Sequence, residues 1–149
     1  MRLIITRPEE DASPLAKKLA SLGHVGILLP LIRIIPRAAV QLPDGPWQAV
    51  CITSANAIRA ATCPSHLKAL PLLTVGPQSM AEARQQGFTR AAAHGGDVNG
   101  LSAYIASHLK PQDGPLLYLS GAETSADLTA KLKSKGFTVH REVVYDAEP

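Results

Sequence analysis

Small and hydroxyl-bearing residues follow four of the apolar runs in this 149-residue chain. They occur as Thr6-Arg7-Pro8, Thr53-Ser54-Ala55-Asn56, Gly76-Pro77-Gln78-Ser79 and Ser120-Gly121-Ala122. Small residues let the backbone N–H groups at helix N-termini approach a ligand, and hydroxyls add hydrogen-bond donors. The pattern indicates a site for carboxylates or phosphates, with the candidate binding residues Thr53, Ser54, Gly76, Ser79, Ser120 and Gly121.

Ordinary helix and turn capping is the alternative explanation for Thr53, Ser54, Ser79 and Ser120, because Ser and Thr are common capping residues. Tyr145 ends the last apolar run, beside Asp146. Its phenol either faces an interdomain cleft or packs as a tyrosine at a sheet edge. The residues alone leave both alternatives open.

Several sharper motifs are incomplete. The glycine-rich stretch 95–100 is followed by Leu101-Ser102 where a phosphate-binding loop needs Lys and then Ser or Thr. Cys63 and His66 lack a second pair of residues at the spacing of a zinc site, and Cys51 lies within an apolar run. The five histidines have no neighbouring nucleophile and acid. We therefore expect no nucleotide, no metal and no cofactor.

Apolar runs alternate with amphipathic segments, which is typical of βα units around a parallel sheet. The first helix carries Ala12, Leu15, Ala16, Leu19 and Leu22 on one face, and a later helix carries Leu101, Tyr104, Ile105 and His108. The pattern predicts strands at Arg2 to Thr6, Gly26 to Ile35, Ala49 to Thr53, Leu72 to Val75, Thr89 to Ala92, Leu116 to Leu119 and Thr138 to Tyr145.

Three of the predicted helices end on the same signal, a glycine followed by a bulky residue. The glycines are Gly23, Gly87 and Gly136. Glycine adopts the left-handed conformation at little cost, and the residue behind it can pack back onto the helix. Each of these pairs predicts a helix end that leads into a strand.

The residues between the predicted strands divide the chain. Residues 36–46 hold three prolines and little periodicity, so we expect a linker there. Residues 47–146 then form a complete α/β domain, and 147–149 begin a second linker. Residues 1–35 form only a partial β-α-β domain, below the roughly 40 residues at which unaided folding becomes rare. That segment needs a partner, so self-association is expected unless further chain completes it.

Composition excludes several classes of protein. Hydrophobic residues make up 46% of the chain and charged residues 18%, which excludes disorder. The formal net charge is only +3 and aromatics are few, so nucleic acid is not an expected partner. No apolar run approaches the roughly 18 residues of a membrane span, and no signal peptide opens the chain. We expect a cytoplasmic protein whose two cysteines are reduced.

Six motifs, in this order and spacing, resemble the uroporphyrinogen-III synthase (HemD-like) family. They span nearly the whole chain. The motifs are Leu3-Ile4-Ile5-Thr6-Arg7-Pro8, Leu19-Ala20-Ser21-Leu22-Gly23-His24, Ile52-Thr53-Ser54-Ala55-Asn56-Ala57, Val75-Gly76-Pro77-Gln78-Ser79, Leu117-Tyr118-Leu119-Ser120-Gly121 and Val143-Val144-Tyr145.

The resemblance implies a cofactor-free, monomeric, cytoplasmic lyase of porphyrin (haem) biosynthesis. Its substrate would be hydroxymethylbilane, a small molecule with eight carboxylates, which it closes into uroporphyrinogen III while inverting ring D. The implied fold is two α/β domains with parallel, flavodoxin-like sheets in three layers, and an active site between the domains. By the resemblance, Tyr145 is the catalytic tyrosine that assists departure of the substrate hydroxyl, and Ser79 stands where relatives often carry threonine.

The family's first domain is discontinuous, and its chain returns to complete that domain after the second. This sequence stops at Pro149, where the return would begin, which explains the partial unit at residues 1–35. From this we expect weak activity or none. The alternatives are an α/β module that binds a small anion without catalysis, and a degenerate, truncated paralogue.

Overall fold

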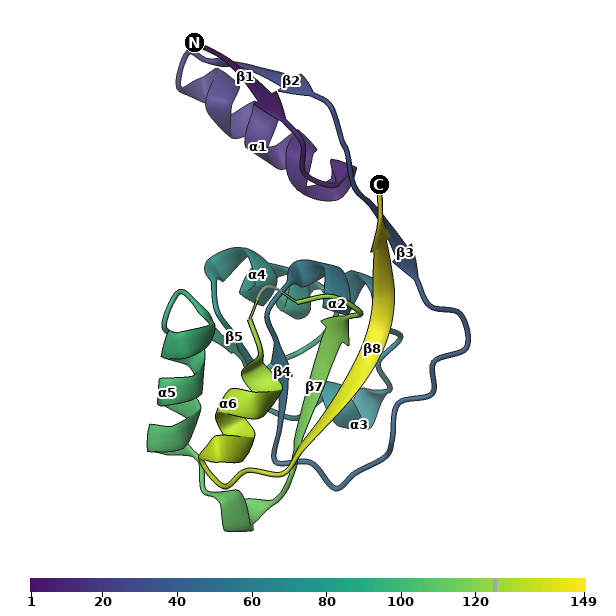
Figure 1. Cartoon of the computed structure of the whole chain (residues 1–149), viewed down its shortest axis with the longest axis vertical. Helices are drawn as coiled ribbons and strands as arrows, with labels where there is room; N and C mark the ends of the chain where they lie inside the picture. Colours follow the sequence, from purple (N-terminus) through teal and green to yellow (C-terminus); the bar gives the residue numbers. More distant parts are fainter. Residues whose placement is uncertain (125) are drawn as a thin grey trace. The chain divides into compact units, whose positions relative to one another are not determined.

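The computed structural model describes residues 1–124 and 126–149 and has an α/β architecture (Figure 1). The strands are β1 (Arg2–Ile5), β2 (Val25–Leu28), β3 (Arg33–Pro36), β4 (Ala49–Ile52), β5 (Leu72–Thr74), β6 (Ala91–Ala93), β7 (Leu116–Gly121) and β8 (Val139–Glu148). The helices are α1 (Glu9–Ser21), α2 (Ala55–Ala60), α3 (Ser65–Lys68), α4 (Pro77–Gln85), α5 (Val98–His108) and α6 (Leu128–Ser134), with a 3-10 turn at Pro111–Asp113.

The chain divides into two compact units. One comprises Met1–Ile35 and Asp146–Pro149, and the other comprises Pro36–Tyr145. A linker was expected at residues 36–46. Pro36 ends β3, and residues 37–46 carry no helix or strand.

The larger unit contains β4, β5, β6, β7 and most of β8. They belong to a sheet in the order β3-β8-β7-β4-β5-β6, in which the five strands from β8 to β6 are mutually parallel. One face packs against residues of α2, α3 and α4 around Ile52 and Leu119. The other packs against α5 and α6 around Cys51 and Tyr118. Helices on both faces confirm the predicted three-layer parallel α/β fold.

The helix ends confirm the predicted stop signals. Gly23, Gly87 and Gly136 all have positive φ angles, at 81°, 99° and 91°. After α4, Gly87 N–H donates to Arg84 O and Phe88 N–H to Ala83 O, and the same paired bonds follow α1 and α6. Phe88 is 1% exposed, so it packs back as expected.

The expected strand from Gly26 to Ile35 was wrong as a single element. The structure splits it into β2, which pairs with β1, and β3, which lies beside β8. Pro30 stands between them, and proline has no N–H to donate to a strand ladder.

Near the other end of the chain, β8 continues to Glu148, so Tyr145 lies inside a strand and not at its end.

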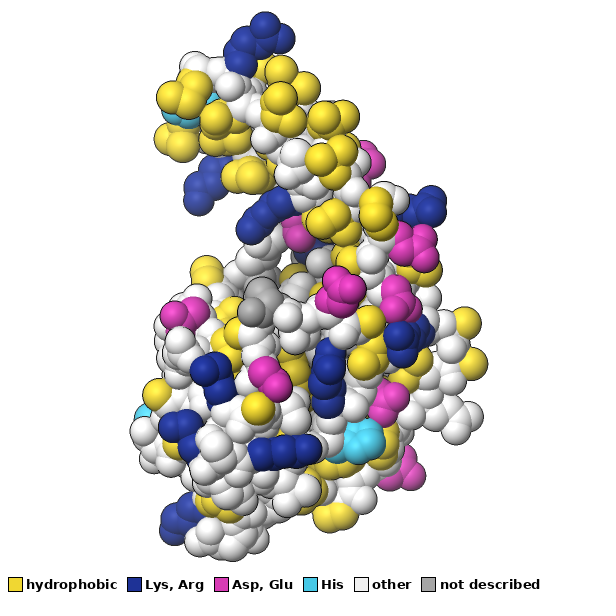
Figure 2. All heavy atoms as spheres, viewed as in Figure 1, with side chains coloured by type: hydrophobic (Ala, Val, Ile, Leu, Met, Phe, Trp, Pro, Cys, Tyr) yellow, Lys and Arg dark blue, Asp and Glu magenta, His cyan; other side chains and the backbone are white. Residues whose placement is uncertain are grey.

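The smaller unit leaves much apolar surface uncovered. Helix α1 covers the β1–β2 pair closely at Gly26, where an added Cβ would lie 3.1 Å from Ala16 Cβ. Leu22, expected on the buried face of α1, is 64% exposed. The large hydrophobic residues that are exposed in the described chain all belong to this unit: Met1, Ile4, Leu22, Val25, Ile27, Leu28, Leu29, Leu31 and Ile32. Figure 2 shows hydrophobic side chains gathered over it.

We predict that the backbone amides of β1 and β2 exchange with solvent roughly tenfold or more faster than those of β4, because two half-covered strands open more easily than buried central ones. All four residues of β4 are buried. Native-state hydrogen exchange followed by NMR measures this. Equal protection in a protein that sediments as a monomer would contradict it.

Candidate functional site

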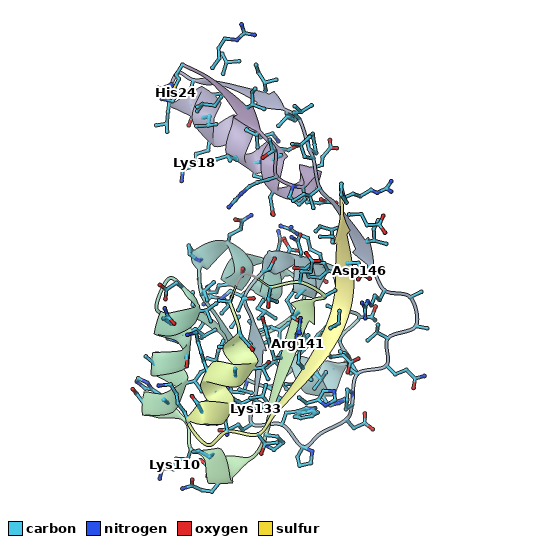
Figure 3. The ribbon with its side chains drawn as sticks, in the orientation of Figure 1. Lys18, His24, Lys110, Lys133, Arg141 and Asp146 are labelled. Atoms are coloured by element: carbon cyan, nitrogen blue, oxygen red, sulfur yellow. The ribbon has the colours of Figure 1, made fainter. Side chains whose placement is uncertain are left out.

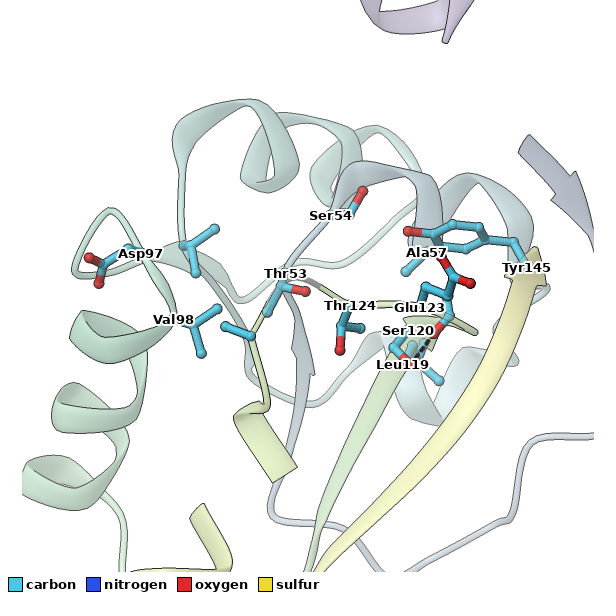
Figure 4. A pocket seen from close by; sticks show the side chains of 13 residues that line it. Thr53, Ser54, Ala57, Asp97, Val98, Leu119, Ser120, Glu123, Thr124 and Tyr145 are labelled. Carbon is cyan, nitrogen blue, oxygen red and sulfur yellow. Dashed lines mark hydrogen bonds between the residues drawn. The ribbon is translucent and has the colours of Figure 1, made fainter. Parts of the chain in front are cut away.

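A pocket of about 380 Å³ lies at the carboxyl ends of the central strands (Figure 4). The parallel register of β4 and β7 brings these ends to one edge of the sheet, beside Tyr145 of β8, and ligands of open α/β sheets bind at such an edge. The lining residues are Thr53, Ser54, Ala57, Val75, Asp97, Val98, Leu119, Ser120, Gly121, Glu123, Thr124, Ala126 and Tyr145, all from the larger unit.

Most of the predicted site residues meet at this pocket. The lining includes Thr53, Ser54, Ser120, Gly121 and Tyr145. The structure does not bring the other two candidates to it. Gly76 precedes α4 as its N-cap residue, and Ser79 is buried within that helix. Val75, one residue before Gly76, reaches the pocket in their place.

The hydroxyls of Thr53 and Ser54, which follow β4, already have protein partners. Ser54 Oγ accepts a hydrogen bond from Asn56 N–H at 3.2 Å, which makes Ser54 the N-cap of α2, as the capping alternative expected. Thr53 Oγ1 lies 3.1 Å from the hydroxyl of Tyr118. Burial raises the pKa of Tyr118, which keeps this phenol protonated and able to hold Thr53 in place.

Tyr145 reaches the pocket through an irregularity in β8. Ser120 pairs with Val143, but Gly121 pairs with Tyr145, so Val144 is an extra residue. Regular alternation would send Val144 and Tyr145 to opposite faces, whereas here both pack against the cluster around Leu119. The Tyr145 ring lies against Gly121, where an added Cβ would come within 2.6 Å of ring carbons.

Arg141 is an important residue that the sequence did not point out. Its Nε donates to Ser120 Oγ at 2.7 Å, and its Nη2 donates to Gly121 O at 2.7 Å and Ala122 O at 3.0 Å. The Ser120 hydroxyl also donates to Gly121 O. Its proton is therefore directed at the backbone and not at the pocket. Sequence patterning offers no signal for Arg141, because it contacts residues some 20 positions earlier in the chain.

The charge of the pocket differs from that of a simple anion site. Its described lining holds the carboxylates of Asp97 and Glu123 and no Lys or Arg. Asp97 caps α5 by accepting a hydrogen bond from Gly100 N–H at 2.7 Å. The sequence held a signal for this role, because Asp is one of the preferred N-cap residues and Asp97 directly precedes the residues of α5. Among the described lining residues, no cationic side chain is therefore available to attract an anion.

Metal and thiol chemistry find no support among the described residues. They contain no group of three or more His, Cys, Asp or Glu placed to hold a metal ion. Burial raises the pKa of Cys51 to about 12 and that of Cys63 to about 11. Both cysteines are therefore thiols at neutral pH and poor nucleophiles.

No helix in the described part of the chain is long and apolar enough to cross a membrane.

A comparison with models of known protein families assigns the chain to a family. Residues 13–149 match the family model described as uroporphyrinogen-III synthase HemD. The chain belongs to this family. The expected resemblance is thus confirmed. A search of curated proteins gives no match.

Solved HemD-family structures share the fold. The uroporphyrinogen-III synthetase of Helicobacter pylori matches with a TM-score of 0.61 and 20% identity, over 81% of this chain and 55% of the other. A mutant uroporphyrinogen III synthase from the extreme thermophile Thermus thermophilus matches with a TM-score of 0.60 and 14% identity, over 100% of this chain and 63% of the other. This HemD chain therefore spans less than two thirds of the length of these relatives, and the likeness establishes the fold alone.

We predict that Gly121→Ala destabilises the protein by about 1–3 kcal/mol, because the new methyl group collides with the Tyr145 ring. Urea unfolding measures the change. The matched control is Gly76→Ala, since an added Cβ at Gly76 meets nothing within 4 Å.

The collision also makes the cost of Gly121→Ala depend on Tyr145. In a Tyr145→Ala background, the loss of unfolding free energy caused by Gly121→Ala should fall by more than half, because the aromatic ring that the new methyl group meets has been removed. An equal cost in both backgrounds would contradict the contact.

Proposed function

We propose that this chain binds hydroxymethylbilane in the pocket at the ends of β4 and β7, beside Tyr145 of β8, and acts as a uroporphyrinogen-III synthase, a lyase that closes this linear tetrapyrrole. Membership of the HemD family supports the reaction. The single structural observation that carries the proposal is the meeting of Thr53, Gly121 and Tyr145 at one pocket.

Little acid-base chemistry is needed for this reaction. The substrate loses its terminal hydroxyl, and the resulting electrophilic carbon is attacked by the substituted carbon of the last ring. We propose that the Tyr145 hydroxyl donates a proton to the departing hydroxyl, which leaves as water, and that the proton released from the last ring when the macrocycle closes restores the phenol. The rest of the catalysis is positioning, which can supply on the order of 7–11 kcal/mol of barrier reduction.

The pocket dimensions and charge suggest which part of the substrate it holds. Its volume of about 380 Å³ is too small for a whole linear tetrapyrrole, so only part of the molecule enters. Asp97 and Glu123 would repel the substrate's carboxylates but can accept hydrogen bonds from pyrrole N–H groups. We infer that a pyrrole ring with its reacting carbon occupies the pocket and that the acidic side chains of the substrate point outward.

The negative charge of the pocket lining also bears on the alternative function of binding a small anion without catalysis. A module for small anions would gain from basic side chains, and the described lining has none. The observations therefore favour the synthase proposal over a small-anion-binding module.

We also propose that the chain associates with itself through the apolar surface of the smaller unit. Contiguous exposed apolar patches are rare on monomeric proteins. Ile4 and Leu31, at 65% and 54% exposed, are typical of this surface. Sedimentation velocity over a range of concentrations tests the proposal, with Ile4→Lys as the variant expected to favour the monomer.

Anaerobic incubation with hydroxymethylbilane, followed by oxidation and separation of the porphyrin isomers, tests the main proposal. Uncatalysed closure gives the isomer without ring inversion, so an excess of isomer III over the protein-free control supports the proposal. If a high concentration of the protein gives the same isomer ratio as the protein-free control, the proposal is refuted.

We predict that Tyr145→Phe lowers the rate of isomer III formation by about a hundredfold, because the general acid is lost while the ring still packs on Gly121. Binding of uroporphyrinogen III, measured by titration, should stay unchanged. Tyr104→Phe is the control. Tyr104 stacks on His94 and His108 and does not line the pocket. An equal loss of rate in both variants would contradict the assigned role.

We predict that Glu123→Gln binds uroporphyrinogen III about two- to fivefold more tightly, because a negative charge facing a polyanion is removed while a hydrogen-bond acceptor remains. The control is Asp113→Asn, which lies near the start of β7, away from the pocket. Weaker binding by Glu123→Gln would show that the Glu123 carboxylate makes a favourable contact.

A further inference from the structure

Arg141 lies on β8, and its side chain is directed at the end of β7 (Figure 3). Its guanidinium donates to three acceptors on consecutive residues: the hydroxyl of Ser120 and the carbonyl oxygens of Gly121 and Ala122. A guanidinium is suited to this task because its donors form a rigid planar fork. A lysine could not reach all three acceptors in the same geometry.

These three acceptors stand where β7 leaves the sheet. The last paired residue of β7 is Gly121, and the chain then bends away through Ala122 and Glu123. Carbonyl groups beyond the end of a strand lose their ladder partners and need others. Arg141 supplies those partners and so fixes the conformation of the segment.

The segment held by Arg141 also contacts Tyr145 of the neighbouring strand β8. Gly121 lies under the Tyr145 ring, and Ala122 N–H donates to Tyr145 O at 3.0 Å. Ser120 and Gly121 line the pocket, whereas Arg141 does not. Arg141 and Tyr145 therefore both hold Gly121 and Ala122, Arg141 through side-chain donors and Tyr145 through its ring and carbonyl.

We propose that Arg141 is a positioning residue that fixes Gly121 and Ala122 and thereby sets the orientation of the Tyr145 phenol over the pocket. The kinetic consequence rests on the function proposed above, but the structural consequence does not. Without Arg141, the end of β7 loses three hydrogen bonds and the phenol loses its fixed support. A displacement of about 1 Å at a reacting group can cost up to a hundredfold in rate.

The test compares Arg141→Met, which keeps the apolar stem, with Arg141→Lys, which keeps the charge. Arg90→Met serves as the control because Arg90 is an exposed arginine of the same unit outside the pocket. Two readouts are taken on the full chain: NMR of the Ala122 amide and the Tyr145 ring, and kcat and KM for formation of isomer III.

In both Arg141 variants we expect the Ala122 amide to exchange about tenfold faster. We also expect the Tyr145 ring signals to move toward their unfolded positions, while the amides of Leu117 and Leu119 stay protected. The kcat should fall about tenfold or more with KM within about twofold, since a catalytic group is misplaced and binding is kept.

Unchanged Ala122 exchange and Tyr145 signals in Arg141→Met would overturn the inference, whatever the activity. Full recovery by Arg141→Lys would show that charge alone suffices and would overturn the role of the fork. If the wild-type chain has no turnover, the proposed function fails and the NMR readout alone decides the role of Arg141. If Arg141→Met does not fold, Arg141→Lys provides the same comparison.

Discussion

Burial of β7 on both faces determines how the larger unit is assembled and where its pocket forms. All six residues of this strand are buried. Leu117 and Leu119 pack toward α2 and α4, while Leu116 and Tyr118 pack toward α5 and α6. Because β4 and β8 pair with β7 on either side, its position sets the register of both neighbours. The pocket forms where this buried strand ends, at Ser120 and Gly121.

The sequence allowed the parts of the fold governed by local rules to be predicted. A glycine with positive φ ends each of α1, α4 and α6 because only glycine adopts that conformation cheaply, and no distant contact is needed. The division of the run 26–35 was missed because its apolar residues look continuous. Only the different partners of β2 and β3 reveal the break.

The site was predictable in its strand-end residues and not in its details. Thr53, Ser120 and Gly121 follow from the rule that ligands bind at the carboxyl ends of parallel strands. Gly76 and Ser79 were expected by the same rule but lie outside the pocket, because Gly76 caps α4 and Ser79 is buried within that helix. The extra residue Val144 and the contacts of Arg141 depend on how β8 pairs with β7, which sequence periodicity does not report.

The proposed binding of a tetrapyrrole at the strand-end pocket is open to direct measurement. The experiment is an anaerobic NMR titration of the labelled chain with uroporphyrinogen III, followed through backbone amides. We expect saturable shifts that are largest at Thr53, Ser54, Gly121 and Tyr145 and small along β1 and β2. Shifts confined to the smaller unit, or no saturable shift at any pocket residue, would contradict the proposed binding site.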